Sequence, residues 1–234
     1  MTEFVLVAGA WLGGWAWDEV VPELRAAGHG VHPLTLSGLA ERRGVPARQQ
    51  THVRDIVEAV ERRDLRDVVL VGHSYAGIPV GQAAARTADR LARVVFVDAV
   101  VPAEGASFVS SWPEGRAGVE ASIAAGGGFW APLGADDYAG QGLDDAQIAR
   151  IVGGSTPHPG ATLTEPAVLT RPLDGLPATY VKCLLDGPDP GEDVAALLAG
   201  ERWRLVEMDT GHWPMFSRPR ELAGILLDAA GPVG

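Results

Sequence analysis

Short apolar runs and amphipathic segments alternate along most of this chain. The apolar runs are rich in β-branched residues, which is typical of strands buried on both faces of a parallel sheet. They predict strands at residues 4–7, 30–34, 67–71, 93–98, 178–185 and 203–208. Apolar positions at helical spacing predict helices that end at residue 27, begin at residues 51 and 75, and cover residues 192–198 and 218–229. This alternation predicts an α/β fold with a mainly parallel, doubly wound sheet, whose ligands bind at the carboxyl ends of the strands.

Individual residues mark the predicted helix boundaries. The first helix carries Pro22 near its first turn and stops at Gly28, in the usual order of proline at the start and glycine past the end. Thr51 is the predicted N-cap of the next helix. Pro79 lies about one turn into the helix after residue 75, where it should make the first turn irregular without preventing the helix.

Residues 102–172 break this pattern. They are rich in Gly, Ala and Pro and show only short helical periods. Their aromatic residues need something to pack on, which favours a helical cap inserted in the sheet domain over a linker. The predicted organisation is a core of residues 1–101 and 173–234 with a cap of residues 102–172.

Size, composition and charge narrow the class of protein. A chain of 234 residues with 47% hydrophobic and 21% charged residues fits one globular domain. Its net charge of -11 disfavours nucleic acid and anionic membranes as partners. The expected partner is a small-molecule substrate, with a homodimer left open. With no basic leader and no apolar run long enough to cross a bilayer, the expected location is cytoplasmic. Cys183 is the single cysteine, which excludes an intramolecular disulfide or a cysteine metal cluster.

The strongest chemical signal is the segment Gly72–Ala76, which joins a predicted strand to a predicted helix with almost no loop. Its small residues allow the sharp turn of a nucleophile elbow, which raises the Ser74 hydroxyl above the sheet. Ala76 stands where the usual pentapeptide has glycine, a minor departure of one methyl group. An ordinary glycine-rich turn is the alternative, but the strand on one side and the helix on the other favour the elbow.

A serine nucleophile needs a base, and His212 is the predicted one because it follows a strand late in the chain. His73 adjoins the serine but should point elsewhere in such a turn. The other histidines lie in or beside an early strand, at the start of a surface helix and in the cap, namely His29, His32, His52 and His158. Activity should rise as the base loses its proton, at roughly pH 6 to 7 for an unperturbed imidazole.

The base in turn needs an acid to hold its tautomer, and three aspartates are candidates. Asp186 ends a predicted strand between the serine and the histidine, which is the expected chain order, and is the first choice. Asp189 lies three residues further along, and Asp98 ends the strand after the elbow helix. Either could take the place of Asp186, and each could instead be a loop residue bonded to local backbone amides.

Four segments carry a resemblance to a known family. FVLVAGAWLGGWAWDEVVPELRAAGHGV, VVLVGHSYAG, VVFVDAVVP and GHWPMFSRPREL resemble the α/β-hydrolase group of plant methylesterases and hydroxynitrile lyases with its bacterial esterase-like members. The resemblance covers the sheet domain from end to end and is weak across the cap. It implies the α/β-hydrolase fold, with Ser74 as nucleophile, His212 as base and Asp186 as acid, because YVKCLLD looks like the family's acidic strand.

The resemblance also implies an oxyanion hole, formed by the backbone N–H groups of Ala10 and Tyr75. The glycine-rich loop of residues 8–15 after the first strand, called the first loop below, agrees with this, as does the position of Tyr75 directly after the predicted nucleophile. The family usually has His-Gly in the first loop where this chain has Ala8 and Gly9.

These observations predict a serine hydrolase that cleaves a small, apolar or aromatic carboxylic ester through an acyl-enzyme, with no metal or cofactor. The residues expected to contact the substrate are Gly9, Trp11, Trp112, Phe129, Trp130, Tyr138 and Trp213. The alternatives are a carbon–carbon lyase of the hydroxynitrile type and a non-catalytic ligand-binding protein. Hydroxynitrile lyases of this group typically carry threonine at the place of Gly9 and lysine directly after the base, where this chain has Trp213, so the esterase is favoured.

Overall fold

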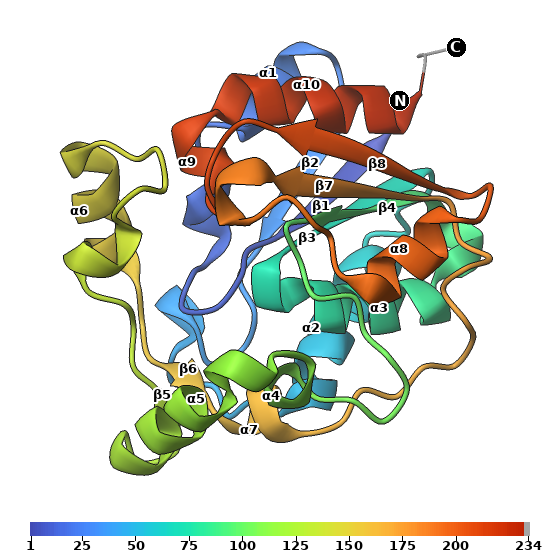
Figure 1. The fold of residues 1–234 in the computed structure, drawn as a ribbon. Coiled ribbons are helices and arrows are strands. Elements are labelled where there is room, and N and C mark those ends of the chain that lie inside the picture. The colour runs from blue at the N-terminus through green and yellow to red at the C-terminus, as the bar shows by residue number, and fades with distance from the viewer. Residues whose placement is uncertain (232–234) are drawn as a thin grey trace.

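The computed structural model describes residues 1–231 and is built around one parallel six-stranded sheet. Its strands lie in the order β2-β1-β3-β4-β7-β8 (Figure 1). They are β1 Glu3–Val7, β2 Gly30–Leu34, β3 Val68–His73, β4 Leu91–Val97, β7 Ala178–Cys183 and β8 Trp203–Met208. Each predicted strand is confirmed to within two residues at either end, because burial on both faces leaves a nearly continuous apolar run in the sequence.

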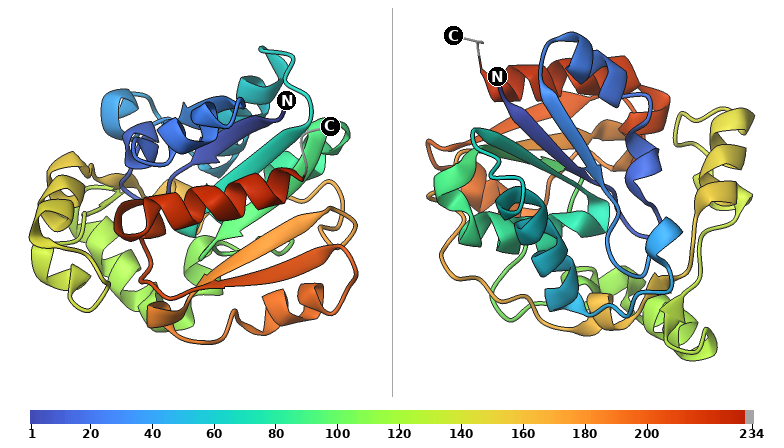
Figure 2. Two further views of the ribbon diagram at one scale, coloured as in Figure 1. Left: turned by 90° about the horizontal axis from the view of Figure 1, so that it is seen from above. Right: turned by 180° about the vertical axis from the view of Figure 1, so that it is seen from behind.

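Helices cover both faces of the sheet (Figures 1 and 2). One face packs against α1 Val21–Ala26 and α10 Pro219–Ala230, and the other against α2 Gln49–Glu61, α3 Gly77–Arg86 and α8 Glu192–Leu198. Alternate residues of β1 divide between the two layers, so Phe4 and Leu6 join the first cluster and Val5 and Val7 the second. The predicted doubly wound α/β arrangement is therefore confirmed.

The first two predicted helices begin differently in the structure. The first predicted helix is a 3-10 turn, η1 Gly14–Trp17, followed by α1, which begins directly before Pro22 because proline favours the first turn. Helix α2 begins at Gln49, and Thr51 is its third residue. The Thr51 hydroxyl nevertheless accepts the backbone N–H of Arg48 at 3.2 Å, so it stabilises this helix end from inside the helix.

Residues 102–172, called the inserted segment below, leave the sheet after β4 and return to it at β7. They form α4 Phe108–Ser111, α5 Pro113–Ala125, β5 Phe129–Trp130, η5 Ala135–Tyr138, α6 Asp145–Gly154, β6 His158–Pro159 and α7 Ala161–Thr164. Helix α5 was not predicted, because Val119 is its one buried residue and its apolar periodicity is correspondingly weak. The segment lies beyond one end of the strands (Figure 2), which places it beside the loops that follow them.

Within residues 1–231, none of the helices combines the length and the apolar character that crossing a membrane requires.

Candidate active site

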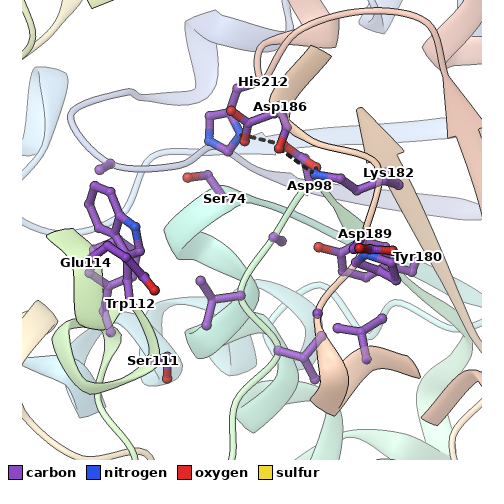
Figure 3. A pocket seen from close by; sticks show the side chains of 18 of the residues that line it. Ser74, Asp98, Ser111, Trp112, Glu114, Tyr180, Lys182, Asp186, Asp189 and His212 are labelled. Carbon is purple, nitrogen blue, oxygen red and sulfur yellow. Dashed lines mark hydrogen bonds and ion pairs between the residues drawn. The ribbon is translucent and has the colours of Figure 1, made fainter. Parts of the chain in front are cut away.

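The carboxyl ends of the sheet strands meet at a cavity of about 950 Å³. Its lining includes one side chain from the loop after each of four strands, β3, β4, β7 and β8. These are Ser74, Asp98, Asp186 and His212 (Figure 3). The structure thus brings the predicted nucleophile, base and first-choice acid into one cavity, together with the alternative acid Asp98.

Three non-glycine residues beside this cavity have left-handed backbones. The φ angles are 56° at Ser74, 43° at Asp98 and 66° at Trp11. Each such conformation costs about 1–2 kcal/mol, so it persists only where the surrounding structure holds it. At Ser74 the strand and helix cross closely, since a Cβ added at Gly72 would lie 3.0 Å from the Cβ of Val80. This is the geometry of a nucleophile elbow.

His212 is held by hydrogen bonds to its backbone and to its ring. Its backbone N–H donates to Oε1 of Gln141 at 2.6 Å, and its carbonyl accepts Nε2–H of His73 at 2.7 Å. Its Nδ1 lies 2.7 Å from Oδ2 of Asp98 and 3.3 Å from Oδ2 of Asp186. With Nδ1 occupied by carboxylates, Nε2 is left for a proton transfer, and Ser74 lies beside this ring (Figure 3).

The two carboxylates at Nδ1 differ in their surroundings. The Asp98 side chain is 2% exposed, and its Oδ1 accepts Nζ of Lys182 at 2.8 Å and the backbone N–H of Cys183 at 3.2 Å. The Asp186 side chain is 43% exposed. Burial alone would raise the pKa of Asp98, but the hydrogen bonds from His212 and Lys182 lower it well below its usual value. Asp189 also lines the cavity and forms neither a hydrogen bond nor an ion pair with His212.

The two carboxylates also raise the pKa of His212. Burial disfavours the charged imidazolium, but the hydrogen bonds and charges of Asp186 and Asp98 outweigh it and raise the pKa of His212 to about 9. The sequence prediction of pH 6 to 7 for this titration assumed an imidazole without such partners. Two carboxylates beside Nδ1 shift the titration of His212 to alkaline pH.

The first loop leaves one amide free between two that are bonded. The N–H of Gly9 donates to Nδ1 of His73 at 3.3 Å, and the N–H of Trp11 donates to Nδ1 of His158 at 3.2 Å. The Ala10 N–H between them has no acceptor within residues 1–231, although Ala10 is only 5% exposed and lines the cavity. A buried amide without a partner costs free energy, so this one is available to an anionic oxygen in the cavity. The N–H of Tyr75 likewise donates to nothing in the described chain.

Four of the predicted substrate-contacting aromatic residues line the cavity, namely Trp11, Trp112, Trp130 and Trp213. Phe129 and Tyr138 do not. Phe129 precedes Trp130 in a two-residue strand, so its side chain points the other way, is 41% exposed and lines a separate cavity of about 350 Å³. The Tyr138 ring is buried against Trp213 at 4.6 Å between centroids.

Gly9 is adjacent to Ser74 and is not part of the cavity lining. A Cβ added there would lie 2.8 Å from the Cβ of Ser74 and 2.9 Å from Nδ1 of His73. The position therefore has no room for a threonine unless the elbow or the His73 ring shifts.

Several residues around the site were not found from the sequence. His73 and His158 were not predicted to act at the site, and His52 was predicted to lie on a surface helix, whereas all three are buried and hydrogen-bonded. The His52 prediction was wrong because α2 turns this residue inward, where Nδ1 meets the Tyr75 hydroxyl at 2.8 Å. Lys182 is the charged residue of an otherwise mostly apolar strand, and that break in the pattern was the available signal.

Asp98, Asp186 and His212 present atoms within 4.8 Å of one another, a spacing that could also suit a metal ion. The Lys182 ammonium already lies on Oδ1 of Asp98, and His212 directs Nδ1 at the other oxygen. The donor set is thus internally paired and suits a charge relay better than a cation.

Comparison with known proteins agrees with this geometry. The profile of the alpha/beta hydrolase family matches residues 4–225. A carbendazim hydrolyzing esterase from a Nocardioides species is 34% identical over 95% of this chain and 97% of its own, and methylesterase 9 of Arabidopsis thaliana is 28% identical with 98% of each chain covered. The solved structure of an extracellular alpha/beta-hydrolase from a Paenibacillus species superposes with a TM-score of 0.87 at 24% identity, covering 99% and 100% of the two chains.

Proposed function

This chain belongs to the alpha/beta hydrolase family, and we propose that it is a serine esterase that cleaves a small carboxylic ester through an acyl-enzyme. The similar esterases from Nocardioides and Arabidopsis support the reaction class. The observation that carries the proposal is Ser74, in a left-handed elbow and in one cavity with His212, whose Nδ1 is bonded to a buried carboxylate.

In the proposed reaction, Nε2 of His212 takes the Ser74 proton as Oγ attacks the ester carbonyl. The N–H groups of Ala10 and Tyr75 bind the resulting oxyanion, and both lack a partner in residues 1–231. His212 then gives its proton to the leaving alcohol, and a water molecule repeats the sequence on the acyl-enzyme.

We assign different parts to the two carboxylates. The single hydrogen on Nδ1 of His212 is directed at Asp98, which is the nearer acceptor at 2.7 Å and is itself held by Lys182. Asp98 therefore orients the imidazole, and Asp186 at 3.3 Å adds negative charge that stabilises the imidazolium. Asp186, the first choice from the sequence, thus acts as the second carboxylate of a pair.

The cavity favours a neutral, apolar or aromatic ester. Tryptophan rings line it, and its acidic residues besides the pair at His212 are Glu114, Asp137, Asp189, Glu192 and Asp193. Besides His212, the basic residue in the lining is Lys182, whose ammonium is paired with Asp98. A substrate that carries its own carboxylate would be repelled, and the carboxylate product of hydrolysis would be driven out.

Gly9 and Trp213 disfavour hydroxynitrile cleavage. Gly9 has no hydroxyl and no room for one, and Trp213 places an aromatic ring directly after the base, where a cation would have to stabilise departing cyanide.

The proposal is tested by incubating the protein with a fluorophosphonate and then measuring intact mass and mapping peptides. We expect one adduct, on Ser74, because an elbow serine beside a base is unusually nucleophilic. Turnover is then measured with neutral p-nitrophenyl esters, a carboxylate-bearing analogue, carbendazim and mandelonitrile. Labelling at another residue, or faster cyanide release from mandelonitrile than hydrolysis of any ester, would refute the esterase.

A further inference from the structure

The inserted segment holds Trp11, the residue directly after the proposed oxyanion donor Ala10, through hydrogen bonds and a ring contact. The Trp11 N–H donates to Nδ1 of His158 at 3.2 Å, and its carbonyl accepts the N–H of Thr156 at 3.0 Å. The indole Nε1–H donates to the carbonyl of Trp130 at 3.3 Å, and the two indole rings lie 4.1 Å apart. The left-handed backbone of Trp11, at φ 66°, is thus fixed by residues far away in the sequence.

In the ring of His158, Nδ1 accepts a hydrogen bond and Nε2 donates one. Because the Trp11 N–H can only donate, Nδ1 must be unprotonated and Nε2 must carry the hydrogen. Nε2 lies 2.8 Å from the hydroxyl oxygen of Thr162, and this hydroxyl donates to the carbonyl of Pro159 at 2.7 Å, so the hydroxyl oxygen accepts from His158. Burial lowers the pKa of His158 well below its usual value, which keeps the ring neutral.

His158 also touches the second proposed donor. Its ring packs edge-on against the ring of Tyr75 at 4.6 Å between centroids. A single fully buried histidine therefore contacts the residue next to Ala10 on one side and Tyr75 on the other.

We propose that His158 is a positioning residue of the oxyanion hole, which accepts the Trp11 N–H and thereby keeps the Ala10 N–H free and directed at the substrate carbonyl. Without this acceptor, the Trp11 amide would be a further buried donor without a partner, and the loop could rotate to satisfy it. His73 does the same for Gly9 on the other side. The inference rests on the proposed esterase activity. It adds that the position of the Ala10 N–H depends on the inserted segment.

Two nearly isosteric variants separate this role from simple packing. In His158→Asn the amide oxygen can take the place of Nδ1, so the Trp11 N–H keeps an acceptor. In His158→Gln the amide lies at the place of Nε2, so Thr162 keeps a partner and the Trp11 N–H loses its own. We expect kcat for a p-nitrophenyl ester to fall by about 10- to 100-fold in His158→Gln and by less than about threefold in His158→Asn, with KM within about threefold in both.

An inhibitor pair provides the second readout. A trifluoromethyl ketone adds to the serine and places an oxyanion in the hole, whereas the matching methyl ketone binds without forming this adduct. The affinity of His158→Gln for the trifluoromethyl ketone should fall by the same factor as kcat, and its affinity for the methyl ketone should not change. Equal kcat in His158→Gln and the unchanged protein, equal losses in both variants, or a change in KM alone would each overturn the inference.

Nitrogen-15 NMR of the histidine rings tests the same point without a substitution, should the variants fail to fold. His158 should show the neutral Nε2–H tautomer from about pH 5 to 9; a protonated ring or the Nδ1–H tautomer would overturn the inference. Failure of the proposed function is recognised separately, because the unchanged protein would then show no ester turnover and no label on Ser74.

Discussion

The elbow at Ser74 and the first loop at Trp11 supply the two halves of the proposed oxyanion hole, but they are held in different ways. The elbow is held by neighbours in sequence, since β3 and α3 adjoin Ser74 and cross closely at Gly72. The first loop is held by partners 119 to 147 positions away, at Trp130 and His158. A strained backbone of local origin can be predicted from a motif, whereas one of long-range origin depends on the assembled fold.

The largest effect is expected when the proposed nucleophile is removed from the elbow. Ser74→Ala should lower kcat by a factor on the order of 10⁶, because the whole relay acts through this hydroxyl. The far-ultraviolet circular dichroism spectrum should not change, since the backbone of the elbow is held by β3 and α3. Steady-state kinetics with a p-nitrophenyl ester measures the loss. A variant that kept a tenth of the activity would mean that another residue is the nucleophile.

The two carboxylates at His212 give the next largest effect. Asp98→Asn should lower kcat by roughly 10⁴, because an amide at 2.7 Å from Nδ1 favours the wrong imidazole tautomer. Asp186→Asn is the matched control and should cost far less, because the Asp186 side chain is 43% exposed and lies 3.3 Å away. Kinetics of both variants under the same conditions decides the ranking, and the reverse order would make Asp186 the orienting acid.

A smaller effect comes from crowding the first loop. Gly9→Ala places a methyl group 2.8 Å from the Cβ of Ser74, so the loop must move away from the elbow. Loss of one aligned oxyanion donor should lower kcat by about 10²- to 10³-fold with little change in KM. Gly118→Ala in α5 is the control, since an added Cβ there has nothing within 4 Å. Equal activities of these two variants would show that the loop tolerates movement.

The smallest expected effect is a shift in pH dependence. With the pKa of His212 at about 9, kcat/KM should rise about tenfold per pH unit between pH 6 and 8 and level off above pH 9. Asp186→Asn should move the midpoint to lower pH, because it removes one charge that favours the imidazolium. A pH series of kcat/KM for both proteins tests this, and a profile already flat at pH 7 would contradict the raised pKa.

The same shift affects stability, and its direction follows from linkage. The pKa of His212 is raised in the folded state from 6.5 to about 9, so the paired carboxylates stabilise the fold fully below about pH 6.5. That contribution disappears as the pH rises through about 9.

The sequence predicts features that depend on neighbouring residues and misses those that depend on distant ones. The strands, the position of Ser74 and the choice of His212 depend on local patterns, and the structure places both residues where those patterns indicated. The environment of His158 and the pairing of Lys182 with Asp98 depend on residues that the fold brings together from distant positions. A single sequence carries no record of such distances. The proposed ranking of Asp98 above Asp186 likewise rests on distances and burial that the sequence does not contain.

Helix α5 lies at the edge of the cavity and tolerates substitution. It contributes Glu114 to the lining and has Val119 as its one buried residue. Substitutions on such a surface usually change stability by within about 0.5 kcal/mol, so many sequences can be tried there without loss of the fold. None of its residues contacts Trp11 or His212 through a hydrogen bond. Substitutions at Glu114 would therefore change the charge and shape of the cavity lining while the residues proposed to perform the chemistry stay constant.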